Sequence, residues 1–240
     1  MKWFGKKQHK SNTGYCVICE KTVTFIEYEK WLRDYYRCNA CDSIPRQRAI
    51  INALNTFLPN WRLQAIHESS PCGISSDYIK RNCNDYSESQ FFLDKEYGLE
   101  SEGIRCENLE CMTFGDEVFD IFVTQDVLEH VMNPELAFAE IHRVLRKGGK
   151  HVFTMPWYPQ YSKSIQRVRM ENGNLVHMLE PMYHGNPVNS EGSIVTYDWG
   201  LDFIDFIHTH ANMSTMVYLY KDRNLGLDAD FLHVFISFKS

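Results

Sequence analysis

The 240-residue sequence has no long apolar run, and no stretch approaches the about eighteen residues that a membrane-spanning helix needs. Its first twelve residues are basic and polar, with no apolar segment behind them, which is not the pattern of a secretory signal. We therefore expect a soluble protein that stays in the cytoplasm and does not enter a membrane.

An excess of basic residues is also missing. Lysine and arginine number 25 against 31 aspartates and glutamates, which gives a formal net charge of -6. Binding to nucleic acid normally requires clustered positive charge that displaces counterions from the phosphates. The charge balance therefore argues against a nucleic-acid partner and favours a small-molecule or glycan acceptor, while the oligomeric state is left open.

The length leaves room for one α/β domain of ordinary size and a small appendage. Hydrophobic residues make up 44% of the chain and aromatic residues 14%, as is typical of a globular protein. There is no internal repeat. We therefore look for one main site and one accessory module.

Four of the eight cysteines form two C-x-x-C pairs, Cys16 with Cys19 and Cys38 with Cys41, eighteen residues apart. Two such pairs can close a tetrahedral site, and Zn²⁺ is the natural occupant. Four sulfur ligands leave no position for water, so the ion is expected to be structural. An iron–sulfur cluster is the alternative, and a redox motif is disfavoured because the thioredoxin-like surroundings are missing.

The other four cysteines are scattered along the chain, and in an intracellular protein they are expected to be small buried residues or reduced thiols. They are Cys72, Cys83, Cys106 and Cys111.

A helix is expected to begin near Ser43, with Ser43 as its cap and Pro45 in its first turn, and to end near Leu58. Arg46 and Arg48 fall in that first turn, where positive charge opposes the helix macrodipole. Pairing with carboxylates or with an anionic ligand is one interpretation of these arginines. A solvated helix face is the interpretation that we favour.

Strand and helix patterns alternate after this helix, which predicts a mostly parallel sheet with right-handed crossovers and ligands at the carboxyl ends of its strands. The expected strands are Leu63–His67, a strand from Tyr86, Phe119–Thr124 and His151–Met155, and the expected helices are Ser76–Arg81 and one capped by Asn133 and ended by Gly148 and Gly149.

The last third of the chain has a different character. Asn172-Gly173 predicts a hairpin turn. The segment Tyr183–Ser193, rich in glycine, asparagine, proline and serine, is a candidate lid over an acceptor site. A helix over Trp199–His210 and two terminal strands, Thr215–Tyr220 and Leu232–Phe238, are expected to follow, the strands forming an antiparallel hairpin at the sheet edge.

Three stretches in the middle of the chain carry a more specific pattern: Cys106–Phe114, Phe119–Val131 with its F-D and E-H pairs, and Glu140–Gly149, which reads E-I-H-R-V-L-R-K-G-G. Together they resemble the second half of a class I S-adenosylmethionine-dependent methyltransferase domain of the type 11 kind. The cysteine cluster followed by C-x-S-x-P-R-x-R resembles zinc-ribbon variants of that family, which are often thought to modify sugars or other small metabolites.

The resemblance implies an α/β fold, a Rossmann-like seven-stranded methyltransferase sheet with a small N-terminal zinc ribbon. It covers about Leu63–Ser240. The expected organisation is a ribbon over 1–43, a connecting helix over 44–61 and a methyltransferase domain over 62–240, with a hairpin and lid insertion at about 160–195.

The family pattern also implies cofactor contacts. Asn108 falls where the family has the aspartate that recognises the adenine amino group, and Leu109 supplies a neighbouring backbone contact. Gln125 and Asp126 fall close to the methionyl part and the reactive methyl of S-adenosylmethionine. Glu129-His130 matches the family's E-H pair, which usually caps and packs the next helix.

The first cofactor loop departs from the family. An acidic residue and a Gly-x-Gly-x-Gly turn usually follow the first strand, because glycine lets the backbone approach the cofactor closely. Here the acidic residue is Glu68, and the glycine positions are Ser70, Cys72 and Ile74. The hydroxyls of Ser69 and Ser70 remain as candidate cofactor ligands.

The acidic residue expected at the end of the second strand is displaced, and either Glu88 or Gln90 is the candidate ribose ligand. For the proton that an acceptor loses, the first candidate base is His184 in the expected lid, followed by His177 and Asp126.

The leading interpretation is a methyltransferase that uses S-adenosylmethionine to methylate an oxygen or nitrogen of a small molecule or sugar. Two alternatives remain: a non-catalytic binding module with the methyltransferase fold, and an RNA methyltransferase whose ribbon grips nucleic acid.

Overall fold

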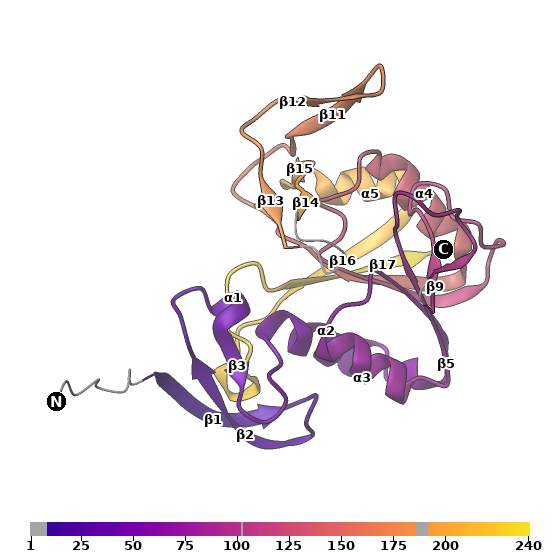
Figure 1. The fold of residues 1–240 in the computed structure, drawn as a ribbon. Coiled ribbons are helices and arrows are strands. Elements are labelled where there is room, and N and C mark those ends of the chain that lie inside the picture. The colour runs from indigo at the N-terminus through magenta and orange to yellow at the C-terminus, as the bar shows by residue number, and fades with distance from the viewer. Residues whose placement is uncertain (1–8, 102, 186–191) are drawn as a thin grey trace.

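An eight-stranded sheet forms the centre of the computed structural model, which describes residues 9–101, 103–185 and 192–240 (Figure 1). In spatial order its strands are β16 (Met213–Leu219), β17 (His233–Lys239), β9 (Leu145–Thr154), β8 (Phe119–Gln125), β4 (Ala65–Ser69), β5 (Asp85–Gln90), β7 (Ile104–Cys106) and β6 (Glu100–Ser101).

The five strands from β9 to β7 run parallel, as expected from the alternating pattern. β17 is antiparallel to both β9 and β16, so the predicted terminal hairpin is confirmed, with β16 at the edge. The short β6, antiparallel to β7, adds an eighth strand to the expected seven.

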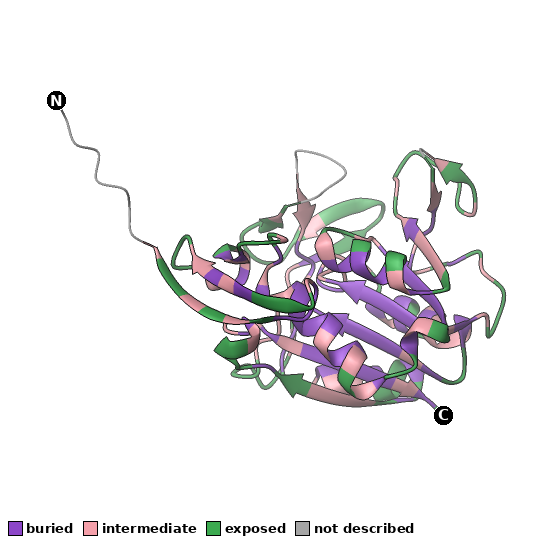
Figure 2. Cartoon of the chain, turned by 90° about the horizontal axis from the view of Figure 1, so that it is seen from below, coloured by how far each residue is buried: buried purple, intermediate pink, exposed green. Residues whose placement is uncertain are grey.

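Helices cover both faces of the sheet (Figure 1). α2 (Pro45–Phe57) and α3 (Ile74–Asn82) lie on one face, and α4 (Pro134–Val144) and α5 (Phe203–Ala211) lie on the other. The central strands are therefore buried on both sides, as Figure 2 shows in purple. In β8, Ile121 and Val123 pack towards α2, while Phe122 packs towards α4, because successive side chains of a strand point to opposite faces.

Three strands form the N-terminal ribbon: β1 (Lys10–Cys16), β2 (Lys21–Glu27) and β3 (Tyr36–Cys38), with the short helix α1 (Leu32–Tyr35) before β3. In this part of the chain the sequence favours a strand only over Thr22–Tyr28, and β2 confirms it. β1 is polar and has no apolar alternation of its own, and it becomes a strand by pairing with β2 over all seven of its residues.

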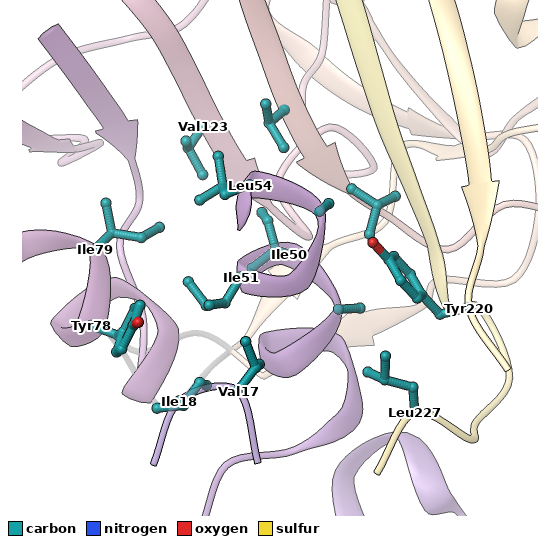
Figure 3. Packing of buried hydrophobic residues seen from close by; sticks show 14 of the residues in the cluster. Val17, Ile18, Ile50, Ile51, Leu54, Tyr78, Ile79, Val123, Tyr220 and Leu227 are labelled. Atoms are coloured by element: carbon teal, nitrogen blue, oxygen red, sulfur yellow. The ribbon is translucent and has the colours of Figure 1, made fainter. Parts of the chain in front are cut away.

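The ribbon shares one hydrophobic core with the sheet (Figure 3). Val17 and Ile18 lie next to Ile51 of α2, and the same cluster of buried residues includes Val123 of β8 and Leu227 near the C-terminus. The predicted boundaries at residues 43 and 61 separate segments of the sequence, but one hydrophobic core extends across both of them.

Three predicted helix ends are wrong in detail. Ile44, not Ser43, is the N-cap of α2, since the hydroxyl of Ser43 lies 3.2 Å from the Cys41 thiol instead. Asn133 is the N-cap of α4, but its side-chain amide donates to Glu110 Oε2 at 2.6 Å and caps no helix amide. α4 ends at Val144, before the two glycines, because the chain then joins the sheet as β9.

The predicted turn at Asn172-Gly173 is confirmed: it joins β11 (Val168–Glu171) to β12 (Asn174–His177), and both residues have positive φ, 50° and 79°. This hairpin projects from the body of the molecule (Figure 1). The expected lid contains β13 (Tyr183–His184) paired with β14 (Ser193–Ile194), and its residues 186–191 lie outside the described residues.

Four further elements complete the described chain: β10 (Ile165–Gln166), which pairs with β15 (Tyr197–Asp198), and the 3₁₀ turns η1 (Trp61–Leu63) and η2 (Arg223–Leu225). Within the described ranges, no helix has the length and apolar character needed to span a membrane.

Candidate active site

The carboxyl ends of β4, β5, β7 and β8 meet at one edge of the sheet, because these strands are parallel and adjacent. This strand-end edge gathers most of the residues that the sequence nominated for the cofactor. Ser69 ends β4 and Ser70 follows it, Gln90 ends β5, Asn108 follows β7, and Gln125 ends β8.

Glu68 lies just inside this edge and is fully buried. Its carboxylate accepts hydrogen bonds from Ser76 Oγ at 2.8 Å, Gln125 Nε2 at 2.6 Å and Tyr86 Oη at 3.0 Å. Burial raises the pKa of Glu68, and these three donors oppose that shift. The carboxylate therefore ties β4 to α3, β5 and β8 beneath the loop, a supporting role that the sequence did not reveal. Direct contact of Glu68 with a cofactor stays a prediction.

The loop after β4 keeps a glycine-like backbone with a single glycine. Ser70, at a glycine position of the family, has φ of 56°, and its amide donates to the Ser89 carbonyl at 2.8 Å. Gly73 has φ of 78°, and a Cβ there would lie 2.3 Å from the Gln47 side chain. Both residues have positive φ, a conformation that strongly favours glycine, so the backbone turns here although two of the expected glycines are serine and cysteine.

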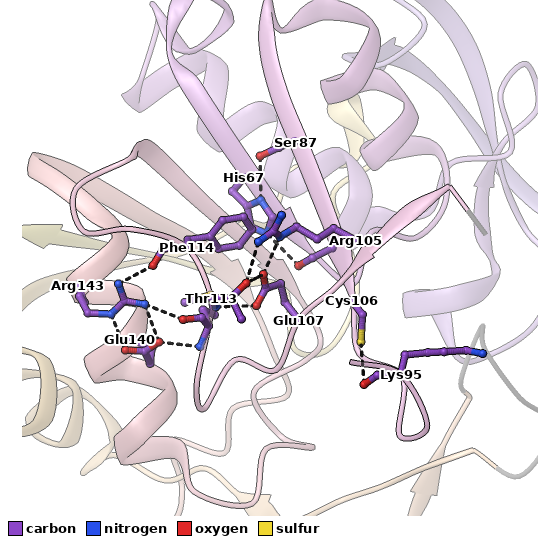
Figure 4. Close-up of polar contacts among 12 residues, drawn as sticks. His67, Ser87, Lys95, Arg105, Cys106, Glu107, Thr113, Phe114, Glu140 and Arg143 are labelled. Carbon is purple, nitrogen blue, oxygen red and sulfur yellow. Dashed lines mark hydrogen bonds and ion pairs between the residues drawn. The ribbon is translucent and has the colours of Figure 1, made fainter. Parts of the chain in front are cut away.

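Hydrogen bonds also order the loop after β7 (Figure 4). Glu107 accepts from Arg105 Nε at 2.7 Å and from the Thr113 amide at 2.8 Å. Arg143 of α4 donates to the Phe114 carbonyl at 2.7 Å. The loop is thus held at both ends against the sheet and α4.

Asn108 and Leu109 lie in this loop. Asn108 Oδ1 accepts from the Glu110 amide at 2.9 Å, which leaves one lone pair of that oxygen for a ligand. Leu109 is buried. Of the two ribose candidates, Glu88 is paired with Lys80 at 2.6 Å, whereas Gln90 lies at the end of β5 with a partly exposed side chain.

Asp126, the first residue after β8, has φ of 54°. Its Oδ2 lies 2.7 Å from Arg33 Nη2 and 3.4 Å from Arg46 Nε, and its Oδ1 accepts from Thr154 Oγ1 at 2.9 Å. Burial alone would raise the pKa of Asp126, but the two guanidinium groups outweigh it and hold the pKa below its ordinary value. Asp126 is therefore a partnered carboxylate and poorly suited to the role of base that the sequence suggested.

The expected solvated face at Arg46 and Arg48 is wrong. Arg46 pairs with Asp126, and Arg48 is fully buried. The Arg48 guanidinium donates to the Tyr36 carbonyl at 2.9 Å and the Gly226 carbonyl at 2.7 Å, and it also contacts the Ser43 carbonyl. Burial lowers the pKa of Arg48 to about 10. Arg33 was missed because nothing in its local pattern points to a carboxylate 93 residues away.

A second cluster lies beside Asp126 and includes His184, the first candidate base. Glu129 Oε1 is 3.6 Å from His184 Nδ1 and 3.8 Å from His130 Nε2. The neighbouring Glu129 carboxylate raises the pKa of His184, against the effect of burial. Glu129 was expected to pack the next helix, so its pairing with His184 was missed. His177 is exposed on β12 and lies outside this cluster.

The four cysteines of the ribbon meet as expected. The Sγ atoms of Cys16 and Cys41 lie 3.9 Å apart and those of Cys19 and Cys38 3.6 Å apart. Tetrahedral zinc–thiolate bonds of about 2.3 Å require sulfur–sulfur distances of about 3.8 Å. The thiols are therefore already spaced for one ion. The scattered cysteines are free thiols, with Cys83 and Cys106 buried and Cys72 and Cys111 exposed.

Comparison with known proteins agrees with this architecture. Residues 75–153 match the family described as "Methyltransferase domain". The match covers this part of the chain. It runs from the start of α3 to the end of β9 and so contains the last three of the four strand ends that form the edge.

Solved structures share the fold of the whole α/β domain. An S-adenosylmethionine-dependent methyltransferase from Mesorhizobium loti has a TM-score of 0.51 and 14% identity, over 80% of this chain and 98% of that one. For DesVI of Streptomyces venezuelae the TM-score is 0.52 and the identity 11%, with 81% and 92% covered.

CalS10, an amino pentose methyltransferase from Micromonospora echinaspora, was solved with S-adenosylmethionine bound and gives a TM-score of 0.52 at 10% identity, over 81% of this chain and 92% of that one. At these identities the likeness establishes the Rossmann-like methyltransferase fold. A search of curated proteins found no match.

Proposed function

We propose that this protein is an S-adenosylmethionine-dependent methyltransferase that methylates an oxygen or nitrogen of a small molecule or sugar. One observation carries the proposal. A domain of the methyltransferase family brings hydroxyl and amide side chains together at the carboxyl edge of a parallel sheet, where α/β folds bind their ligands.

The side chains at the strand-end edge suit the cofactor chemically. Serine hydroxyls at Ser69 and Ser70 can donate to a carboxylate, and the amides of Gln90 and Asn108 can both donate and accept, as ribose hydroxyls and an adenine ring require. Gln125 closes the edge beneath them through its bond to Glu68. When bound, S-adenosylmethionine supplies a methyl group on a positively charged sulfur, so no protein nucleophile is needed.

Methyl transfer to a hydroxyl or a protonated amine requires that the acceptor lose a proton. Asp126 is already paired with two arginines. We therefore propose that the adjacent cluster of Glu129, His130 and His184 accepts the proton that the acceptor loses. In this arrangement Arg33 and Arg46 keep Asp126 ionised and fixed, and β13, paired with β14, carries His184 to the Glu129 carboxylate.

The acceptor class rests on two supports. The net negative charge disfavours a polyanion such as RNA. CalS10, which shares the fold, is an amino pentose methyltransferase, and this makes a sugar a sensible first acceptor to test. The ribbon thiols are proposed to hold one structural Zn²⁺, in line with their spacing.

Calorimetric titration with S-adenosylhomocysteine tests the cofactor site. One saturable site per chain is expected, and Asn108→Ala and Gln90→Ala should each weaken it about tenfold, the effect of one lost hydrogen bond to a ligand. Asn60→Ala is the matched control, because Asn60 is exposed and lies before β4, away from the strand-end edge. Absence of binding at millimolar ligand would favour a non-catalytic module with this fold.

Transfer of labelled methyl from S-adenosylmethionine to a panel of sugars, amines and RNA tests the reaction. We expect His184→Ala to lower turnover by about a hundredfold, the usual contribution of acid–base catalysis, with cofactor binding retained. Unchanged turnover in this variant would remove His184 from the mechanism. Label appearing only in RNA would support the RNA methyltransferase alternative.

A further inference from the structure

Glu129, His130 and His184 come together from separate parts of the chain. Glu129 and His130 lie between β8 and α4, and His184 lies in β13 of the insertion. One ligand atom of each lies within 4.8 Å of the other two. The cluster is therefore compact enough for all three side chains to contact a single ion.

The Glu129 carboxylate has no adequate partner. Its side chain is 1% exposed, and neither Oε1 nor Oε2 accepts a hydrogen bond from any described residue. The two imidazoles lie at 3.6 and 3.8 Å, beyond hydrogen-bond distance. An ionised carboxylate buried in this way is costly unless a positive group compensates it.

The hydrogen bond on the other side of the His130 ring determines which nitrogen faces Glu129. His130 Nδ1 lies 2.8 Å from the Ile194 carbonyl, which can only accept, so Nδ1 carries the proton. In the neutral ring, Nε2 then directs a lone pair towards the Glu129 carboxylate. The lone pair of His130 Nε2 and the negative Glu129 carboxylate repel each other, and a cation between them removes this repulsion. A backbone carbonyl behind a histidine is also the usual way to orient a metal-binding imidazole.

The backbone that carries Glu129 and His130 is anchored to Thr196, which lies between β14 and β15. The Thr196 amide donates to the Glu129 carbonyl at 2.7 Å, and the Thr196 hydroxyl lies 2.7 Å from the Val131 carbonyl. Glu129 and His130 are therefore held against the segment that also supplies the Ile194 carbonyl. The side chains need only small rotations to close around an ion.

We propose that Glu129, His130 and His184 bind one divalent transition-metal ion. Two imidazoles and one carboxylate suit Zn²⁺, Mn²⁺ or Fe²⁺ better than Mg²⁺ or Ca²⁺, which prefer oxygen ligands. Ligands at about 2.1 Å from an ion lie about 3.0 to 3.5 Å apart. The Glu129 carboxylate lies at 3.6 and 3.8 Å from the two imidazoles, close to that spacing. Three protein ligands leave coordination positions open, unlike the four thiolates of the ribbon.

The open coordination positions allow the ion to bind the methyl acceptor. This role rests on the proposed function. An acceptor hydroxyl bound to the ion would have a lowered pKa and would pass its proton to solvent water, leaving an alkoxide to attack the methyl group. The site would thus select acceptors that offer an oxygen ligand, such as neighbouring hydroxyls of a sugar. In this form His184 serves as a ligand, and the ion takes over the activation of the acceptor.

Mn²⁺ binding to zinc-loaded protein tests the site directly, without cofactor or acceptor. Mn²⁺ prefers nitrogen and oxygen ligands and does not compete for the ribbon thiolates. Electron paramagnetic resonance should show one bound Mn²⁺ per chain, weakened at least tenfold in Glu129→Gln and His184→Ala. His177→Ala is the matched control, because His177 is exposed in the same insertion and outside the cluster.

Co²⁺ provides a second probe, because its visible absorption should appear without thiolate charge-transfer bands. Mn²⁺ should also raise the melting temperature of the unmodified protein but not that of Glu129→Gln, which loses the buried charge and should fold at least as well without metal. Absence of binding by both ions, or equal binding by the Glu129→Gln variant, would overturn the proposal.

The two proposals fail separately. Metal binding that depends on these residues, in a protein that binds no S-adenosylhomocysteine, would leave the ion site standing and remove the methyltransferase activity. Cofactor binding and methyl transfer without any metal site would do the reverse and leave the Glu129–His184 pair as the proton acceptor.

Discussion

Two clusters of potential metal ligands in this protein contrast in almost every respect. The ribbon cluster consists of four cysteines in two short motifs, and its members belong to the hydrophobic core or pack against it. The second cluster joins Glu129 and His130 to the distant His184, and both of its histidines are partly exposed. The first is closed by four identical ligands, and the second is open.

This difference teaches how position decides the use of such a site. A four-thiolate site inside a core has no room for substrate. The free energy of metal binding there stabilises the folded state. A three-ligand site beside the carboxyl edge of a parallel sheet lies where α/β folds bind their ligands.

The ribbon cluster should dominate stability. Cys38→Ser should abolish stoichiometric zinc and lower the free energy of unfolding by more than about 5 kcal/mol, because structural zinc sites contribute about 10 kcal/mol or more in small domains. Metal analysis and urea denaturation measure both effects. Cys72→Ser is the control, since Cys72 is an exposed free thiol. Iron in place of zinc would support the iron–sulfur alternative, and unchanged stability would contradict a structural ion.

The link between the ribbon and the rest of the chain should be the next largest effect. Arg48→Met leaves the buried carbonyls of Tyr36 and Gly226 without a donor and should cost about 3 kcal/mol in unfolding free energy. Arg81→Met, on the exposed surface of α3, should cost less than about 0.5 kcal/mol. Similar losses in the two variants would mean that the ribbon is not coupled through this guanidinium.

Acid should destabilise the sheet through its two buried histidines, His67 and His151. Burial lowers the pKa of each to about 3, and Arg105 also lowers that of His67. Because the unfolded pKa is near 6.5, the unfolded chain binds more protons below that pH, so stability is full above about pH 6.5 and falls towards pH 3. At pH 5 the loss should be about 2 kcal/mol per histidine.

Denaturation at pH 7.5 and pH 5 measures this slope in the unmodified chain and in His151→Phe. The phenylalanine stays compatible with the stacked Phe153 ring and removes one titrating group. We expect the acid-induced loss to shrink by about 2 kcal/mol in the variant. An unchanged loss of stability between pH 7.5 and pH 5 would show that His151 does not cause it.

The contacts of Arg33 and Arg46 with Asp126, beside the open cluster, include the smallest expected effect. Arg46→Met breaks a 3.4 Å contact with Asp126 and should cost about 0.5 kcal/mol. Arg33→Met breaks a 2.7 Å contact made by a side chain that is 6% exposed and should cost about 2 kcal/mol. Urea denaturation measures both losses. Equal losses would show that the deeper burial of Arg33 does not make its ion pair more stabilising than that of Arg46.

The fold was predictable where the pattern is local. The Asn172-Gly173 turn, the buried strand β8 and the cluster of four cysteines were all expected, because each depends on a few neighbouring residues. The end of α4 was not, because residues after Val144 satisfy a helix pattern but are drawn into the sheet between β8 and β17. Here tertiary pairing overrode local preference.

The sequence predicted which residues belong to the candidate site, but it did not predict which of them contact one another. Glu68 was expected at the cofactor, and the sequence did not reveal its hydrogen bonds with Ser76, Gln125 and Tyr86 beneath the loop. His184 was expected as a base, but its partner Glu129 was assigned to helix packing. Residue type suggests what a side chain can do, whereas the neighbour that it meets depends on the order of the strands.

By itself, the sequence determined the methyltransferase-like motifs, the alternation of strands and helices, and the closed cysteine site, because these are written in short spacings and periodicities. Only the tertiary structure decided that Arg33 and Arg46 hold Asp126 and that His184 meets Glu129 and His130. The physical reason is that packing of the ribbon and the insertion onto the sheet sets these distances, and no local pattern in the chain records which distant segments share one edge.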